Sequence, residues 1–161
     1  MIQMFRSYYL KDDPFNKNNN RNVRNTPKRN YNCGGYALET FSWYCPHNEE
    51  DDTFLGYDYG FDTQEEAWVK TMYAVSKMIL DFEGNLRMIK SLKQLHKDTE
   101  RVVAFRLSSE GDFHYIKKTK NGWRHKCGAS FYIRRMSEHD VFNTNWNGRY
   151  DGPIILLAIK K

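Results

Sequence analysis

The order of the periodic segments is the feature that most constrains the fold of this 161-residue chain. Apolar spacing typical of helices ends before residue 100, and short β-prone runs separated by turn residues follow. We predict strands at 102–107, 113–118, 123–126, 131–135 and 154–159. Helices followed by strands predict an α+β domain, in which N-terminal helices pack on a C-terminal antiparallel sheet.

Two helices are predicted upstream of the sheet from their start signals. Asn32 can cap a helix that begins at Cys33 and extends to residue 43, ahead of Pro46. Thr63 and Glu66 form a capping box that opens a second helix. The apolar face of the second helix is predicted from four residues at helical spacing, Trp68, Met72, Val75 and Ile79.

A third helix is predicted over 86–95, after the break at Gly84 and Asn85. Its apolar positions recur three residues apart, at Leu86, Ile89, Leu92 and Leu95. This spacing is typical of one face of an amphipathic helix, and the remaining positions are rich in Lys and Arg.

The first 30 residues differ in composition from the rest of the chain. Residues 11–30 are rich in Asn, Lys and Arg and almost lack apolar side chains, so they cannot bury enough apolar area to offset the entropy of ordering. We therefore predict a basic, Asn-rich arm over 1–30 and a single domain over 31–161. The net charge of +5 would permit weak contact of this arm with nucleic acid or an acidic polymer, although no nucleic-acid-binding module is recognisable.

The sequence predicts a soluble protein without a membrane span. No run approaches the roughly 18 apolar residues of a transmembrane helix, and the N-terminus lacks the apolar core of a secretory signal. Three cysteines cannot all pair with one another, so at least one thiol is free, which favours a reducing, cytoplasmic compartment. The cysteine spacing fits neither a zinc ribbon nor a disulfide framework, so we expect no metal and no cofactor.

Cys33 is the candidate nucleophile. It lies at the predicted start of a helix, where unpaired N–H groups favour a thiolate. Gly34 and Gly35 follow it, and we expect them to leave the sulfur open to a substrate carbonyl. The alternative is a small buried residue, which is the commonest role of a free cysteine. Cys45 and Cys127 lack this setting and are predicted to be packing residues.

His114 is the candidate general base, and His125 is the candidate third residue of the site. His114 begins a predicted strand, which would hold the imidazole rigidly; the alternative is a structural histidine in a half-buried sheet. If Asn121 and Gly122 form a two-residue turn, His125 lies far from His114; if 118–121 form a four-residue loop, the two histidines are opposite each other. Four other polar residues could orient His114: Asp112, Asp140, Asn143 and Asn145.

The chain resembles the papain-like cysteine peptidase superfamily, in particular compact bacterial and phage members and NlpC-type peptidases. Asn-Cys-Gly-Gly-Tyr-Ala-Leu over 32–38 is similar to the element in which a cysteine starts a helix. Asp-Phe-His-Tyr over 112–115 is similar to the strand that carries the histidine, and 112–128 also resembles a stretch of uncharacterised bacterial and phage proteins with a Trp-x-His-Lys-x-Gly element. The Cys-Gly-Ser-Cys-Trp run of papain and a glutamine for its oxyanion hole are absent.

This resemblance implies a papain-like fold and a thiol hydrolase, a peptidase or amidase, in which His114 activates Cys33 and an acyl-enzyme forms. The substrate would be a protein or peptide, and a member from a phage would act in the host cytoplasm. The resemblance leaves the oxyanion donor open; Asn32 and the main-chain N–H of Cys33 are the candidates.

Two other functions fit the same sequence. The first is a catalytically inactive papain-like protein of phage or bacterial origin that binds or inhibits a protein partner stoichiometrically, because a fold does not dictate an activity. The second is nucleic-acid binding through the basic residues at 17–30.

Overall fold

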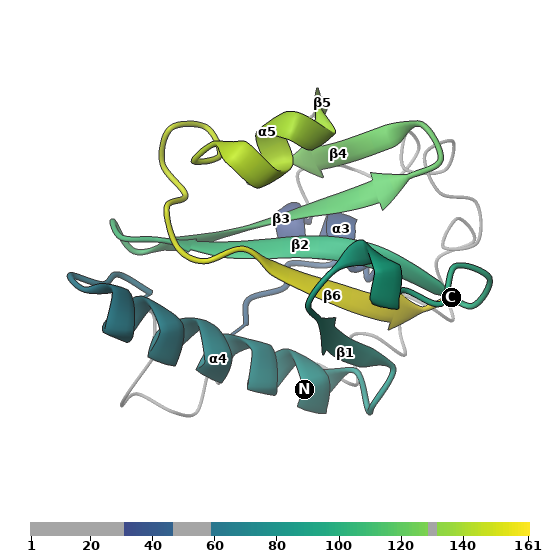
Figure 1. Ribbon diagram of the computed structural model, residues 1–161, viewed down its shortest axis with the longest axis horizontal. Helices are drawn as coiled ribbons and strands as arrows, with labels where there is room; N and C mark the ends of the chain where they lie inside the picture. The colour runs from purple at the N-terminus through teal and green to yellow at the C-terminus, as the bar shows by residue number, and fades with distance from the viewer. Residues whose placement is uncertain (1–30, 47–58, 129–131) are drawn as a thin grey trace.

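The computed structural model describes residues 31–46, 59–128 and 132–161. The predicted arm over 1–30 lies outside these residues. Six strands form one sheet in the order β1-β6-β2-β3-β4-β5, and all neighbouring strands are antiparallel (Figure 1). The strands are β1 (Leu86–Ile89), β2 (Glu100–Ser108), β3 (Asp112–Thr119), β4 (Gly122–Lys126), β5 (Ile133–Met136) and β6 (Ile155–Lys160).

Helices cover both faces of this sheet. The helices are α3 (Cys33–Ala37), α4 (Gln64–Asp81) and α5 (Glu138–Asn143), and a 3-10 turn, η2, spans Leu92–Gln94. On one face, α3 and α4 bury a core that includes Phe105 and Leu157. On the other, α5 and the segment after it bury a second core around Trp146. The predicted α+β class with an antiparallel sheet is therefore confirmed, and none of the described helices could span a membrane.

The helix predicted over 86–95 is wrong. Leu86 to Ile89 form the edge strand β1, which pairs with β6 and places Leu86 opposite Ile159. Two strand residues three positions apart point to opposite faces of a sheet. Leu86 packs in the core under α4 and Ile89 in the core under α5, so both are buried in a strand although their spacing is that of a helix.

The helix predicted over 33–43 is shorter than expected. It ends at Ala37, and Glu39 and Phe41 then take positive φ values of 58° and 50°. The chain therefore reverses, and the segment ending at Tyr44 packs back against the helix. Tyr44 and Phe41 are buried as predicted, but from a loop and not from a helical face.

The capping box of α4 is confirmed in part. The Thr63 hydroxyl accepts a hydrogen bond from the Glu66 N–H at 3.1 Å, while the Glu66 carboxylate accepts from the N–H of Asp62. The predicted apolar face is rotated from the observed one, since Trp68 is 49% exposed. The helix buries a set of mostly small or linear side chains, Ala67, Thr71, Ala74, Val75, Met78 and Asp81.

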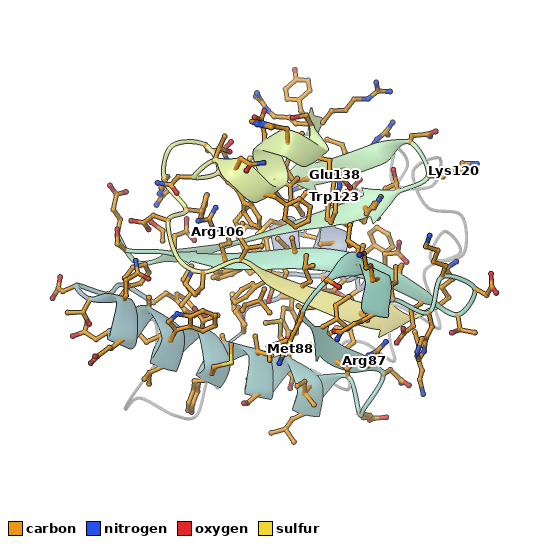
Figure 2. The ribbon with its side chains drawn as sticks, in the orientation of Figure 1. Arg87, Met88, Arg106, Lys120, Trp123 and Glu138 are labelled. Atoms are coloured by element: carbon orange, nitrogen blue, oxygen red, sulfur yellow. The ribbon has the colours of Figure 1, made fainter. Side chains whose placement is uncertain are left out.

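Helix α5 lies between two predicted strands, in a segment for which no helix is predicted from the sequence. Ser137 caps it by accepting from the N–H of Asp140 at 3.1 Å. Its Glu138 accepts a hydrogen bond from the Trp123 indole of β4 at 3.2 Å, and the two side chains lie together in Figure 2. Arg106 extends from β2 and donates to the carbonyl oxygens of Gly152 and Thr144, both at 2.7 Å, which fixes the segment after α5 on the sheet (Figure 2).

Candidate functional site

The position of Cys33 is set by the buried amide of Asn32. Its Oδ1 accepts from the N–H groups of Gly35 and Tyr44, both at 3.0 Å, and its Nδ2 donates to the Tyr44 carbonyl at 2.7 Å. One side chain therefore caps α3 and joins it to the returning loop. The predicted role of Asn32 as an oxyanion donor stays a prediction, because only one of its two Nδ2 hydrogens is used by this network in the described residues.

The two glycines after Cys33 have a structural function that the sequence did not suggest. A Cβ at Gly35 would lie 1.9 Å from the Ser42 carbonyl oxygen, and one at Gly34 would lie 3.0 Å from that of Tyr44. Glycine is required because the returning loop passes directly against the helix. This packing, and not an open approach to the sulfur, accounts for the Gly-Gly pair.

The Cys33 thiol lies against the main chain that flanks His114. Its Sγ donates to the Phe113 carbonyl oxygen at 4.0 Å, and the Tyr115 N–H also contacts the sulfur. Main-chain groups two residues apart point to the same edge of a strand. The sulfur thus occupies the edge of β3 beyond its last pair with β4, Lys117 with Arg124.

The imidazole of His114 contacts that of His125. Its Nε2 lies 2.9 Å from His125 Nδ1, and the rings are perpendicular. Tyr150 stacks on the other side of the His114 ring with a centroid separation of 4.9 Å, and Trp146 meets it edge-on at 6.2 Å. Because neighbouring rings hold it on several sides, the His114 side chain is only 2% exposed and has a fixed orientation.

Neither of the two registers considered for the β3–β4 hairpin is correct. Thr119 pairs with Gly122, so the turn lies at Lys120 and Asn121, and Gly122 takes a φ of 101° as the residue after it. This register places His125 between the two predicted positions, on the same face as His114 and diagonal to it. The diagonal contact is short enough for the hydrogen bond between the rings.

Other residues that could have oriented His114 are engaged elsewhere. The Asp112 carboxylate accepts from the Phe113 N–H and from the Tyr150 hydroxyl. Asn143 donates to the His139 carbonyl, while Asp140 lies in the cap of α5 and Asn145 faces Arg106. Of the proposed orienting groups, His125 alone contacts the His114 ring within the described residues.

Cys33 and His114 line one cavity of about 350 Å³. Cys33 belongs to the core under α3, whereas the His114 ring lies on the other face with Tyr150, so they approach the cavity from the two sides of the sheet. The opening between the separating ends of β3 and β4 allows this. No hydrogen bond joins the thiol to His114 in the part of the chain described.

A larger hollow of about 950 Å³ lies elsewhere, beside α4, and its described lining contains no cysteine or histidine.

Burial favours the neutral forms of both groups. It raises the pKa of the Cys33 thiol to about 12, against the opposing effect of the Tyr115 N–H, and the Asp112 carboxylate raises it further. Burial lowers the pKa of His114 to about 3, and the neighbouring His125 lowers it as well. Burial and Arg134 also lower the pKa of His125. The site therefore holds a protonated thiol and neutral imidazoles at pH 7.

Cys127 is a polar member of this site that the sequence analysis assigned to packing. Its Sγ lies 3.7 Å from His125 Nδ1 and 3.9 Å from the side-chain nitrogen of Asn147, and it lines the cavity that Cys33 lines. The i, i+2 spacing of His125 and Cys127 was the available signal, since such residues share one face of a strand. Cys45 also lines the cavity.

No protein family model, curated protein or solved structure matches the chain at a significant level.

The low pKa of His114 predicts loss of stability in acid. In the unfolded chain this histidine takes up a proton near pH 6.5, whereas in the folded protein it does so only near pH 3. Between these values the unfolded state binds more protons, so the free energy of unfolding falls as pH falls, by up to about 1.4 kcal/mol per pH unit for one group. Urea unfolding of metal-free protein from pH 7 to 4 should show this slope.

The His114→Gln variant should lose most of this slope, whereas His96→Gln should keep it, because His96 is exposed. An unchanged slope in His114→Gln would show that His114 is not the group responsible.

Proposed function

We propose that the protein is a cysteine hydrolase in which Cys33 is the nucleophile, His114 the general base and His125 the residue that positions His114. The observation that supports it best is the 2.9 Å contact between the two imidazoles at a cavity that the Cys33 thiol shares. The chain also has the element order of the papain-like superfamily: a cysteine at the start of a helix, a histidine on a strand and a polar partner on the next strand. We therefore propose this superfamily as its family.

The reaction requires one tautomer of the histidine pair. His114 Nε2–H donates to His125 Nδ1, which leaves His114 Nδ1 free to accept the thiol proton of Cys33. The sulfur then attacks a carbonyl carbon, and His114 returns the proton to the leaving nitrogen or oxygen as its bond to carbon breaks. A water molecule, deprotonated in turn by His114, hydrolyses the thioester and regenerates the thiol.

The developing oxyanion needs donors near the sulfur. The main-chain N–H of Cys33 lies in the first turn of α3, where N–H groups have no partner within the helix. Asn32 lines the same cavity, and its Nδ2 group has a second hydrogen besides the one donated to the Tyr44 carbonyl. We propose these two as the oxyanion hole.

A peptide or related amide is the proposed substrate class. The cavity is small, so it accommodates the reacting bond and one short side chain, while the rest of the substrate must lie outside. Trp43, which is 54% exposed, and Arg149 border the opening and provide an apolar surface and a positive charge.

Turnover of fluorogenic esters, thioesters and peptide amides by the full-length protein tests this proposal. We expect hydrolysis of at least one class, lost in proportion to the fraction of Cys33 alkylated by iodoacetamide, as quantified by peptide mass spectrometry. Cys45→Ser should retain activity. Turnover that survives complete alkylation of Cys33, or no turnover by any class, would contradict the proposal.

A second candidate function is stoichiometric binding of a protein partner by an inactive scaffold. The observation that favours it is the burial of the nucleophile, since Cys33 is 4% exposed and its pKa is raised to about 12. This function predicts that Cys33→Ala combined with His114→Ala leaves the biological effect intact, whereas the hydrolase predicts its loss. Nucleic-acid binding by 17–30 concerns residues that the structure does not describe.

A further inference from the structure

We propose that His114, His125 and Cys127 form a binding site for a single Zn²⁺ ion. Their ligand atoms converge: His114 Nε2, His125 Nδ1 and Cys127 Sγ all lie within 4.8 Å of one another. The two contacts that involve His125 Nδ1 are 2.9 Å to His114 and 3.7 Å to Cys127. Imidazole nitrogen and thiolate sulfur are the ligands that Zn²⁺ prefers.

These distances are close to those of a tetrahedral zinc site. Bond lengths of about 2.0 Å to nitrogen and 2.3 Å to sulfur place two nitrogens about 3.3 Å apart and nitrogen and sulfur about 3.6 Å apart. The distance from His125 Nδ1 to Cys127 Sγ, 3.7 Å, is close to this value, and the two imidazoles need to separate by a few tenths of an ångström. His114 Nε2 and Cys127 Sγ, which lie within 4.8 Å of each other, need to come closer together. The ion would take the place of the proton that the two rings share.

The surroundings of the three residues support binding. His114 is fixed by the stacked ring of Tyr150, and the Asn147 amide donates to the Cys127 sulfur at 3.9 Å, a contact that favours a thiolate. His114 and Cys127 also line the cavity, so its interior offers the fourth coordination position to water. Three protein ligands with one open position are typical of an accessible zinc site.

The proton balance of binding is simple. Cys127 loses its thiol proton, while each imidazole keeps one proton on the nitrogen that does not bind the ion, so about one proton is released per Zn²⁺ near neutral pH. His114 must then carry its proton on Nδ1. If the proposed hydrolase function holds, this tautomer cannot accept the proton of Cys33, and Zn²⁺ inhibits the enzyme.

A titration of the reduced, full-length protein with Co²⁺ as a spectroscopic substitute for Zn²⁺ tests the site. We expect one equivalent to bind, with a thiolate-to-cobalt charge-transfer band that Zn²⁺ abolishes by displacement. Cys127→Ser should remove the band, and His125→Asn should weaken binding at least tenfold. Cys33→Ala and Cys45→Ser should keep both band and affinity, which separates this site from the proposed nucleophile.

A second measurement needs no variant. Saturating Zn²⁺ should slow alkylation of Cys127 by iodoacetamide at least tenfold and leave that of Cys45 unchanged. Three results would overturn the proposal. They are the absence of a charge-transfer band, a band that survives Cys127→Ser, and equal alkylation of Cys127 with and without Zn²⁺. If the protein binds the metal but shows no turnover even when it is metal-free, the hydrolase is refuted and the zinc site stands.

Discussion

Replacement of His114 by alanine is expected to slow acyl transfer to Cys33 by two to four orders of magnitude, roughly the contribution of a positioned general base. Cys33→Ala should abolish transfer, because in the proposed mechanism the Cys33 sulfur is the atom that attacks the substrate. The physical reason is that the buried thiol, with a pKa of about 12, is protonated at pH 7 and needs a base at the moment of attack. Initial rates with the best substrate of the panel provide the measurement.

His125 supplies the matched test of positioning. His125→Asn preserves an acceptor for His114 Nε2–H and should retain most of the activity, whereas His125→Leu removes the acceptor and should lower kcat about 100-fold with a smaller change in KM. His139→Ala, at an exposed position on α5, is the control and should have no effect. Equal rates for the Asn and Leu variants, both shown to be folded, would contradict the positioning role.

The Gly35→Ala variant is expected to lose about 3 kcal/mol of stability or more, a large fraction of the roughly 5–15 kcal/mol that stabilises a typical domain. The added Cβ would lie 1.9 Å from the Ser42 carbonyl oxygen. The position of a Cβ is fixed by its own main chain and the oxygen belongs to the main chain, so no side-chain rotation relieves the overlap. Either α3 or the returning loop must move, and the capping network of Asn32 breaks with it. Urea unfolding followed by tryptophan fluorescence measures the loss.

Gly84→Ala is the matched control. Its Cβ meets no atom within 4 Å, but its φ of 80° is left-handed, so we expect a cost of about 1 kcal/mol. If Gly35→Ala were as stable as Gly84→Ala, the close approach of loop and helix would be wrong, and with it the position of Cys33.

The fold class was predictable from local patterns, whereas one edge of the sheet was not. Each of the five strands predicted after residue 100 overlaps an observed strand, because apolar alternation and turn residues act locally. Strand β1 was mistaken for a helix because its two buried ends, Leu86 and Ile89, serve two different cores. A helix and a strand that is buried on both faces can have the same apolar spacing. The two are distinguished only by the helices that cover both faces of the sheet, which the spacing does not reveal.

Cys33, His114 and His125 could be selected as candidates from the sequence, but Cys127 and the geometry of the cavity could not. The contact of His114 with His125 depends on the β3–β4 register, and registers that differ by two residues leave every side chain on the same face. The place of Cys127 depends on where β4 separates from β3. The function of Gly35 depends on a loop that returns to α3 after the positive φ values of Glu39 and Phe41. All three are tertiary features.

The most direct test of the central claim is to locate the acyl group itself. The full-length protein should be mixed with an activated ester, quenched in acid within the first turnover and digested for peptide mass spectrometry. The hydrolase predicts one acyl group, on Cys33, that accumulates in the wild type and is absent from His114→Ala on the same time scale. An acyl group on Cys45 or Cys127 instead, or equal acylation of Cys33 without His114, would contradict it.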